Sequence, residues 1–372
     1  MGLVRAGRFV TIVLLVLAGV GALARPERSL AQPDPASARA LDAYRAMQRY
    51  LYDPRAGLYQ GASNRHAWPF SQALSATVAV AEVPGAPPTI ARAVSSRLRA
   101  LRAYWSPRLR PPAYTTNPGG GDVFYDDNEW ISLELVRRSR VTGDGRLLAR
   151  ARQIFRLVQR GWDPDSRHSC PGGVFWTRSQ RVDHRNTVTS APGAQLALDL
   201  YAVTRGPSYL SWGRRLYWWV ERCMREPGTN LYQDHISTDG STDGTIWSYN
   251  QGSMVGAALL LYKLTGNPDY LARAERTAVA AFAYFDDTRL ASEPPYFAAI
   301  YFRNLLALEA VTGGTTYRDA IRRYADRAWS TFRDTRTGLF KFRGGSRPTL
   351  LEQASMVQIY ALLAAPRPDL LG

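Results

Sequence analysis

The fold of the chain is indicated by the stretch 130–143, which reads WISLELVRRSRVTG. Apolar side chains recur in it at helical spacing, and its closing Thr-Gly pair provides the left-handed stop at which many helices end. The same mark, or a close variant, returns as VTRG at 203–206, LTG at 264–266 and VTG at 311–313. The stretch therefore predicts one unit of an internal repeat, in which a helix ends at a glycine and a second helix follows.

Each mark separates two predicted helices, an apolar one before it and an amphipathic one after it. The predicted pairs, one of them around a fainter VPG mark at 83–85, cover 68–81 with 90–104, 130–141 with 147–158, 191–203 with 209–224, 252–264 with 270–285, and 296–311 with 317–332. Single helices over 41–52 and 352–363 stand at the two ends and can pair to close a ring. An open stack would need polar capping repeats, which the sequence lacks. The prediction is an all-α fold, an (α/α)6 toroid of six helical hairpins.

The long loops of this repeat lead into the first helix of each pair, so they share one face, the mouth of the ring. Aromatic rings stack on sugar faces and amides bind hydroxyl groups, so an aromatic, acidic mouth suits a neutral polysaccharide. Asn250 is also placed to cap a helix beginning at Gly252, and Asp234 to fix its own turn, so structural roles stay open for both. The residues expected at the mouth are Trp68, Trp176, Asn186, Asp234, Tyr249, Asn250 and Gln251.

An acidic motif precedes the second inner helix, in the stretch 119–130, GGGDVFYDDNEW. Its two aspartates, Asp126 and Asp127, fall at the start of a predicted helix. Retaining glycosidases use two carboxyl groups roughly 5 Å apart, one as the nucleophile and one as the proton donor. The alternative is structural, because acids in a first helical turn stabilise the helix dipole. A second adjacent pair, Asp286 and Asp287, lies in a turn context and is interpreted as structural.

The composition is that of a globular protein of 372 residues. An apolar content of 45% and an aromatic content of 11% exclude a disordered chain. The net charge of +16 comes almost entirely from arginine, because Lys263 and Lys341 are the only lysines. The arginines are spread along the chain without a dense block, so no nucleic-acid partner is expected.

The N-terminus has the pattern of a secretory signal peptide over 1–24. Two arginines precede a short apolar run, and small residues offer cleavage after Ala24 or Ala31. A Pro-rich tether is expected over 25–37 and the folded domain over 38–372. The protein is expected to be secreted or extracytoplasmic, bacterial, monomeric and without a membrane span after cleavage. An uncleaved anchor is the alternative, although the apolar run is short for a bilayer.

Two cysteines, Cys170 and Cys223, are the only ones in the chain. Export permits a disulfide between them, and two buried thiols are the alternative. Two cysteines and four scattered histidines do not make the ligand spacing of a metal site, so neither a metal nor a cofactor is expected.

The stretch 125–130, YDDNEW, resembles the adjacent-aspartate motif of glycoside hydrolase family 76, the endo-α-1,6-mannanase family. The resemblance runs from about residue 38 to the C-terminus. Three further blocks match that family's pattern in the same order, namely GVFW at 173–176 with NTVTSAP at 186–192, LYQD at 231–234, and YNQGSMVGAA at 249–258.

The resemblance implies a metal-free (α/α)6 hydrolase that cleaves α-1,6-mannosidic linkages of a mannan-type polysaccharide with retention. It implies that Asp126 is the nucleophile and Asp127 the acid and base. Such a pair must titrate apart, because the charge of one carboxylate raises the pKa of the other. The implied substrate-binding residues, completed by the loop tryptophans, are Trp68, Tyr125, Asn128, Trp176, Asn186, Asp234, Tyr249, Asn250 and Gln251.

Other functions are also compatible with the sequence. A transglycosylase could remodel a surface glycan on the same two aspartates. A lyase or an unsaturated-uronyl hydrolase could use the same toroid, and its anionic substrate would suit the net charge of +16. A non-catalytic toroid could bind glycan through the aspartates alone. The natural glycan and the choice between endo and exo action stay open.

Overall fold

The computed structural model describes residues 1–2, 35–179, 182–342 and 347–365. The chain divides into an N-terminal unit, Met1–Gln32, and a domain over Pro33–Gly372. Except for the first two residues, the predicted signal peptide lies outside the described residues, as does most of the predicted tether. The last three residues of that tether, 35–37, belong to the first helix of the domain.

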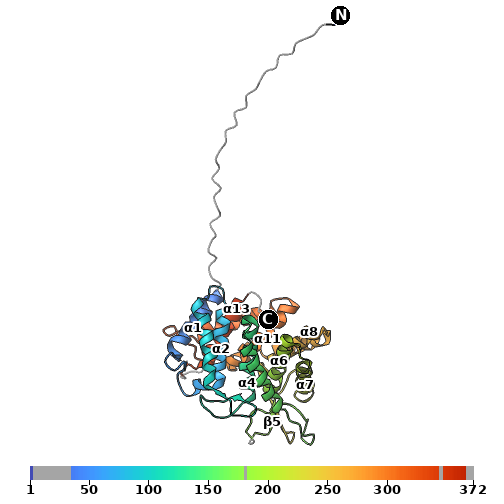
Figure 1. Ribbon diagram of the computed structural model, residues 1–372. Helices are drawn as coiled ribbons and strands as arrows, with labels where there is room; N and C mark the ends of the chain where they lie inside the picture. Colours follow the sequence, from blue (N-terminus) through green and yellow to red (C-terminus); the bar gives the residue numbers. More distant parts are fainter. Residues whose placement is uncertain (3–34, 180–181, 343–346, 366–372) are drawn as a thin grey trace. The chain divides into compact units, whose positions relative to one another are not determined.

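The domain is a ring of inner helices surrounded by outer helices (Figure 1). Each inner helix packs against its two inner neighbours, and α13 packs against α2, so the inner ring is closed. The inner helices are α2 (Ala67–Ala81), α4 (Tyr125–Thr142), α6 (Thr187–Thr204), α8 (Ser248–Thr265), α11 (Pro295–Thr312) and α13 (Leu350–Ala364). The outer helices are α3 (Pro88–Ala100), α5 (Gly145–Arg160), α7 (Pro207–Cys223), α9 (Pro268–Tyr284), α12 (Thr316–Thr331) and α1 (Pro35–Leu51). The predicted toroid of six hairpins is confirmed.

The last inner helix takes its outer partner from the other end of the chain, because α13 packs closely against α1. The Gln353 side chain on α13 donates to the carbonyl of Ala43 on α1 at 2.8 Å. The predicted pairing of the first and last helices is therefore also confirmed.

The recurring threonine lies where three of the inner helices, α4, α6 and α8, connect to the next outer helix. The hydroxyl of Thr142 donates to the carbonyl of Arg138 at 2.7 Å and accepts from the backbone N–H of Asp144 at 3.3 Å. Thr204 and Thr265 make the same two contacts in their own units. The threonine thus satisfies a carbonyl of the last helical turn and fixes the short connection.

Three inner helices begin earlier than the apolar pattern predicts. The predicted starts are 130, 191 and 252, whereas α4 begins at Tyr125, α6 at Thr187 and α8 at Ser248. The first turns carry polar side chains, so they do not extend the apolar repeat from which the starts were predicted. Asn250 therefore lies inside the first turn of α8 and does not cap a helix at Gly252.

A short helix that the sequence did not predict, α10 (Asp287–Ser292), follows the outer helix α9. The Asp286 side chain caps it by accepting from the backbone N–H groups of Thr288 and Arg289. Asp287 pairs with Arg327 at 3.3 Å. Both acids have the structural roles that their turn context predicted.

Short antiparallel strands lie in the connections between the helices of the ring. β1 (Tyr52–Asp53) pairs with β2 (Leu58–Tyr59), and β3 (Trp105–Ser106) pairs with β4 (Ala113–Tyr114). β5 (His184–Asn186), β6 (His235–Ser237) and β7 (Thr242–Asp243) form a three-stranded sheet in that order. Two 3-10 turns, Ser63–Arg65 and Leu101–Ala103, complete the elements, the second replacing the predicted end of the helix over 90–104. Within the described ranges, no helix has the length and apolar character needed to cross a membrane.

Candidate active site

A cleft of about 590 Å³ opens where the first turns of the inner helices meet the three-stranded sheet. Its acidic lining consists of Asp126, Asp127 and Asp234. No lysine or arginine belongs to the part of the lining that the structure describes. The other lining residues named below are Trp68, Phe124, Trp130, Trp176, His184, Asn186, His235, Tyr249 and Phe297.

The acidic pair lies in the first turn of α4, which brings both carboxyl groups to the cleft. Asp126 is half-buried, and Asp127 is only 9% exposed. One carboxyl oxygen of Asp126, Oδ1, is buried without a hydrogen-bond partner among the described residues. Asp126 itself lines the sugar-sized cleft, so this carboxyl group lies beside the space for substrate with one oxygen that no described residue binds.

Burial raises the pKa values of both acids. It raises the pKa of Asp126 to about 7, against hydrogen bonds from the Asp127 backbone and the Trp176 side chain, and the charge of Asp234 adds to the rise. The pKa of Asp127 lies well above its usual range, first because of burial and then because of the charge of Asp126. Asp126 therefore ionises before Asp127, and the pair still carries at least one proton near neutral pH.

Asp234 is held against the first turn of α8. One of its oxygens accepts from the Asn250 amide at 3.2 Å and from the Tyr249 hydroxyl at 3.5 Å. Its other oxygen lies 2.9 Å from Nδ1 of His235. The side chain thus binds other elements instead of fixing its own turn, which was the structural alternative.

Aromatic rings line the cleft around the acids. The ring centroids of Trp68 and Trp130 lie 6.1 Å apart, and both residues belong to the same apolar cluster as Tyr249 and Phe297. The Phe297 ring lies 4.1 Å from that of Tyr249. Trp176 packs edge-on to Phe124 at 4.9 Å and keeps 36% of its surface exposed. These rings offer the apolar faces on which sugars stack.

The sequence did not single out two histidines that complete this wall. His184 stacks on Trp176 at 5.7 Å, and its ring lies 4.2 Å from that of His235. Nδ1 of His184 lies 2.7 Å from the side-chain oxygen of Asn186, two residues along β5. Side chains two residues apart on a strand share a face, so the strand register would have placed His184 beside Asn186. The three-residue strand is too short to be recognised in the sequence.

Four residues expected to bind substrate, Asn250 among them, lie outside the described lining of the cleft. Asn128 is fully buried and pairs with both backbone groups of Tyr114, at 2.8 Å and 3.0 Å. Gln251 is fully buried and binds both backbone groups of Tyr232, at 2.8 Å and 2.9 Å. The buried ring of Tyr125 packs so closely on Gly161 that a Cβ there would lie 2.4 Å from it. These side chains position the first turns of α4 and α8, and Asn250, also fully buried, acts through Asp234.

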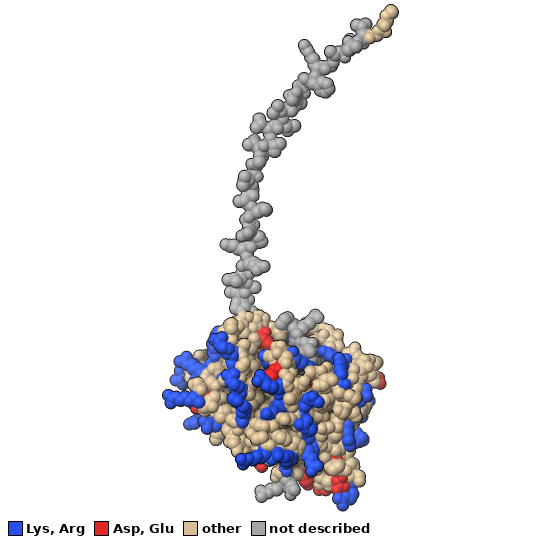
Figure 2. Space-filling model, in the orientation of Figure 1, with Lys and Arg blue, Asp and Glu red and all other residues tan. Residues whose placement is uncertain are grey.

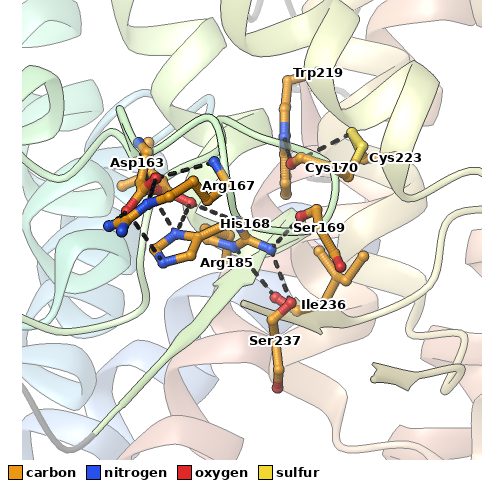
Figure 3. A network of polar contacts seen from close by, with 12 residues as sticks. Asp163, Arg167, His168, Ser169, Cys170, Arg185, Trp219, Cys223, Ile236 and Ser237 are labelled. Carbon is orange, nitrogen blue, oxygen red and sulfur yellow. Dashed lines mark hydrogen bonds and ion pairs between the residues drawn. A yellow bond between two sulfur atoms is a disulfide. The ribbon is translucent and has the colours of Figure 1, made fainter. Parts of the chain in front are cut away.

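A buried ion pair braces the wall that carries the histidines (Figure 3). Arg185 lies on β5 between two cleft residues, and its fully buried guanidinium group pairs with Asp163, which is equally buried. The same group donates to the carbonyls of Ser169 at 2.8 Å and Ser237 at 2.9 Å. Nδ1 of His168 also lies 3.0 Å from an oxygen of the Asp163 carboxylate. The network ties the loop after α5 to the sheet.

A disulfide between Cys170 and Cys223 lies beside this network, with 6.0 Å between the two Cα atoms. The indole N–H of Trp219 donates to the carbonyl of Cys170 at 3.1 Å. The bridge therefore fixes the same loop to α7.

Asp234, His235 and Asp243 are spaced like metal ligands, with one possible ligand atom from each within 4.8 Å of the others. The nearest atoms of Asp234 and His235 already bind each other. The Asp243 carboxylate accepts from the backbone and the hydroxyl of Thr245. Hydrogen bonds account for these three side chains without an ion.

The closed helical ring and the adjacent pair of buried carboxyl groups in a sugar-sized cleft are the features of a glycoside hydrolase of the helical-toroid class. The chain belongs to Glycosyl hydrolase family 76, whose pattern it matches over residues 36–365. The family that the YDDNEW motif predicted is confirmed.

Similar proteins come from fungi and from bacteria. Mannan endo-1,6-alpha-mannosidase DCW1 of Saccharomyces cerevisiae is 28% identical over 37% of this chain and 32% of its own length. The chain thus spans about a third of the curated relatives that it matches. A family 76 glycoside hydrolase from a bovine Bacteroides thetaiotaomicron strain is 26% identical, with a TM-score of 0.79 over 89% of this chain and 78% of that one.

A second similar structure contains a ligand. It is an inactive variant of the alpha-1,6-mannanase of Salegentibacter sp. HEL1_6, with two adjacent aspartates replaced by alanine, in complex with alpha-1,6-mannotetrose. At 20% identity and a TM-score of 0.76, over 89% of this chain and 99% of that one, it shows the shared fold.

Proposed function

We propose that the protein is a secreted glycoside hydrolase that cleaves α-1,6-mannosidic linkages of a mannan-type polysaccharide with retention. The observation that carries the proposal is the acidic pair, whose two carboxyl groups lie together in an aromatic cleft where burial raises both pKa values. The names of the yeast and Salegentibacter proteins supply the linkage. Export rests on the signal-like N-terminus, and bacterial origin and a monomeric state stay predictions from the sequence alone.

The different pKa values of the two acids assign their roles. The Asp126 carboxylate attacks the anomeric carbon while the Asp127 proton passes to the leaving glycosidic oxygen. The bond to the leaving sugar breaks, and a glycosyl-enzyme remains on Asp126. Asp127, now ionised, takes a proton from water, whose oxygen attacks the same carbon and releases the sugar. Two displacements restore the original configuration.

The charge of the cleft favours a neutral substrate. Three aspartates line it, and the described lining contains no lysine or arginine. An anionic uronic acid would be repelled by these carboxylates. The net charge of +16 does not support a lyase, because no lysine or arginine belongs to the described lining of the cleft. The geometry thus supports mannan over an acidic polysaccharide.

The test uses linear α-1,6-mannan, product sizing and proton NMR of the first-formed product. The wild type should release shorter mannans of unchanged anomeric configuration. Asp126→Ala should abolish turnover, because no other side chain can form the glycosyl-enzyme. Asp127→Ala should slow mannan cleavage by about 10²–10⁴-fold, the usual contribution of a general acid. It should spare the first step with an activated aryl mannoside, and added azide should then partly restore turnover.

Asp287→Asn is the matched control, because it changes the second adjacent pair and should leave activity unchanged. A product of inverted configuration would remove Asp126 from the role of nucleophile. Binding of mannan without any cleavage by the wild type would favour a glycan-binding toroid instead. Longer products would indicate a transglycosylase.

A further inference from the structure

A second groove, of about 490 Å³, lies on the outer wall between α3 and α5. Four guanidinium groups line it, those of Arg99, Arg102, Arg146 and Arg150, and we call it the arginine groove. It shares no lining residue with the active-site cleft. Figure 2 shows that basic side chains are spread over the visible face of the domain. In the arginine groove, by contrast, four basic side chains line a single hollow.

The groove has a large excess of positive charge. Its one described acid, Asp144, already accepts from Nε of Arg146 at 3.0 Å and from a terminal nitrogen of that group at 2.9 Å. Arg99 and Arg102 have no carboxylate partner among the described residues, and Arg102 uses only its Nε, on the carbonyl of Arg99. Elsewhere on the outer wall, arginines such as Arg273 pair with acids on neighbouring helices. Three positive charges therefore remain uncompensated in the groove.

One arginine is also held in place. The guanidinium carbon of Arg150 lies 3.5 Å from the ring centroid of Trp105, a stacked contact that orients the group. Hydrogen bonding from Arg150 to the Tyr114 side chain fixes it further, and it lowers the pKa of Tyr114 against the larger effect of burial. An oriented guanidinium group loses less freedom on binding an anion.

The lining also selects the kind of anion. Guanidinium groups bind phosphate oxygens in pairs of parallel hydrogen bonds. Between the arginines lie apolar side chains, including Leu98 and Leu147, which can pack against a group attached to the phosphate. The volume lies within the usual range of small-molecule sites, so the groove has room for a phosphate and an attached sugar or glycerol unit. We propose that the arginine groove binds a phosphate ester, apart from the hydrolytic site.

The test is a binding measurement on the full domain at low ionic strength, by isothermal titration calorimetry. The probes are mannose 6-phosphate, glycerol 3-phosphate and inorganic phosphate, with mannose as the neutral control. We expect the two esters to bind more tightly than inorganic phosphate, and added salt to weaken all three. Sedimentation with phosphatidylglycerol or phosphatidylcholine vesicles then shows whether a lipid or a soluble glycan is the source of the ester.

The decisive variant is Arg99→Gln with Arg102→Gln, which removes two of the three uncompensated charges without breaking an ion pair. It should weaken ester binding by about tenfold or more, since each guanidinium contact to a phosphate is charge-assisted. The matched control, Arg276→Gln with Arg323→Gln, removes the same charge from exposed sites on α9 and α12 and should change binding less than about twofold. Hydrolysis of neutral mannan should be unchanged in both variants.

Equal weakening in the groove variant and the control would show non-specific attraction to net charge and would overturn the proposal. No ester binding to the wild type would overturn it as well. Neither result bears on mannan cleavage, so the two proposals fail separately.

Discussion

The substitution Asp163→Asn, which replaces the acid of the buried ion pair with Arg185, should destabilise the domain strongly. Asp163 and Arg185 both have almost no exposed side-chain surface, at 1% and 0%. The amide keeps the shape of the carboxylate but removes its charge, so the guanidinium group stays buried without a counter-ion. His168, which also contacts this carboxylate, loses the same partner.

The size of the effect follows from the burial. Removing one member of a buried ion pair costs about 3–5 kcal/mol, because the remaining charge is still out of water. Unfolding entropy of about 2.1 cal/mol/K per residue over roughly 330 residues gives about 0.7 kcal/mol/K, so Tm should fall by about 4–7 °C. Three carbonyls still accept from the arginine and partly hold it, which places the result towards the lower end.

The assay is differential scanning calorimetry with mannan kinetics on the same samples. The control, Asp165→Asn, removes an acid two residues away whose partner Arg167 is almost fully exposed, and its Tm should hardly change. β5 carries His184 and Asn186 into the cleft, so Asp163→Asn should raise KM more than it lowers kcat. Equal Tm values for the two variants would refute the argument that the buried pair braces the wall.

Three further predictions concern ionisation and redox state. The value of kcat/KM should fall as pH drops below about 7, because protonation of Asp126 removes the nucleophile. It should also fall at high pH, when Asp127 loses the proton that it donates. A value of kcat/KM that stays constant down to the usual pH range of carboxyl groups would contradict the raised pKa values. Burial raises the pKa of Glu129 well above its ordinary 4.5, so the contribution of Glu129 to stability is complete below pH 4.5 and is lost as pH rises. The difference in Tm between Glu129→Gln and the wild type should therefore shift in favour of the variant as pH rises. Parallel curves of Tm against pH for the two proteins would argue against this. Thiol titration of denatured, unreduced protein should find neither Cys170 nor Cys223 reactive, and two reactive thiols would exclude the bridge.

The ring could be predicted because its signals are local. The threonine of such a mark has a physical function in the structure. The hydroxyl of Thr142, for example, donates to a carbonyl in the last turn of its helix and accepts from a backbone N–H of the connection that follows. The apolar inner helices and amphipathic outer helices follow from burial on all sides or on one. Closure by the first and last helices followed from counting.

The cleft could be predicted only in part. Asp126, Asp127 and Asp234 were found because a motif names them and the structure places them together. Asn128 and Gln251 were predicted to bind substrate, whereas the structure buries both, since a sequence motif does not show which way a side chain faces in the first helical turn. Both amides turn away from the cleft and bind the backbone of the preceding loop. His184 and His235 were missed because their partnership arises between strands about fifty residues apart.

The pairing of α1 with α13 also determines when the protein can finish folding. The hydrogen bond from Gln353 to Ala43 joins residues 310 positions apart, and the one from Gln358 to Gln72 joins residues 286 apart. Contacts of such long range form slowly, because the intervening chain must first be ordered. While the chain is being synthesised from its N-terminus, the faces of α1 and α2 that pack on α13 have no partner until that final inner helix emerges. A chain cut short before residue 350 would expose those surfaces permanently, so loss of this one helix should cause aggregation of the whole enzyme and not merely a looser end.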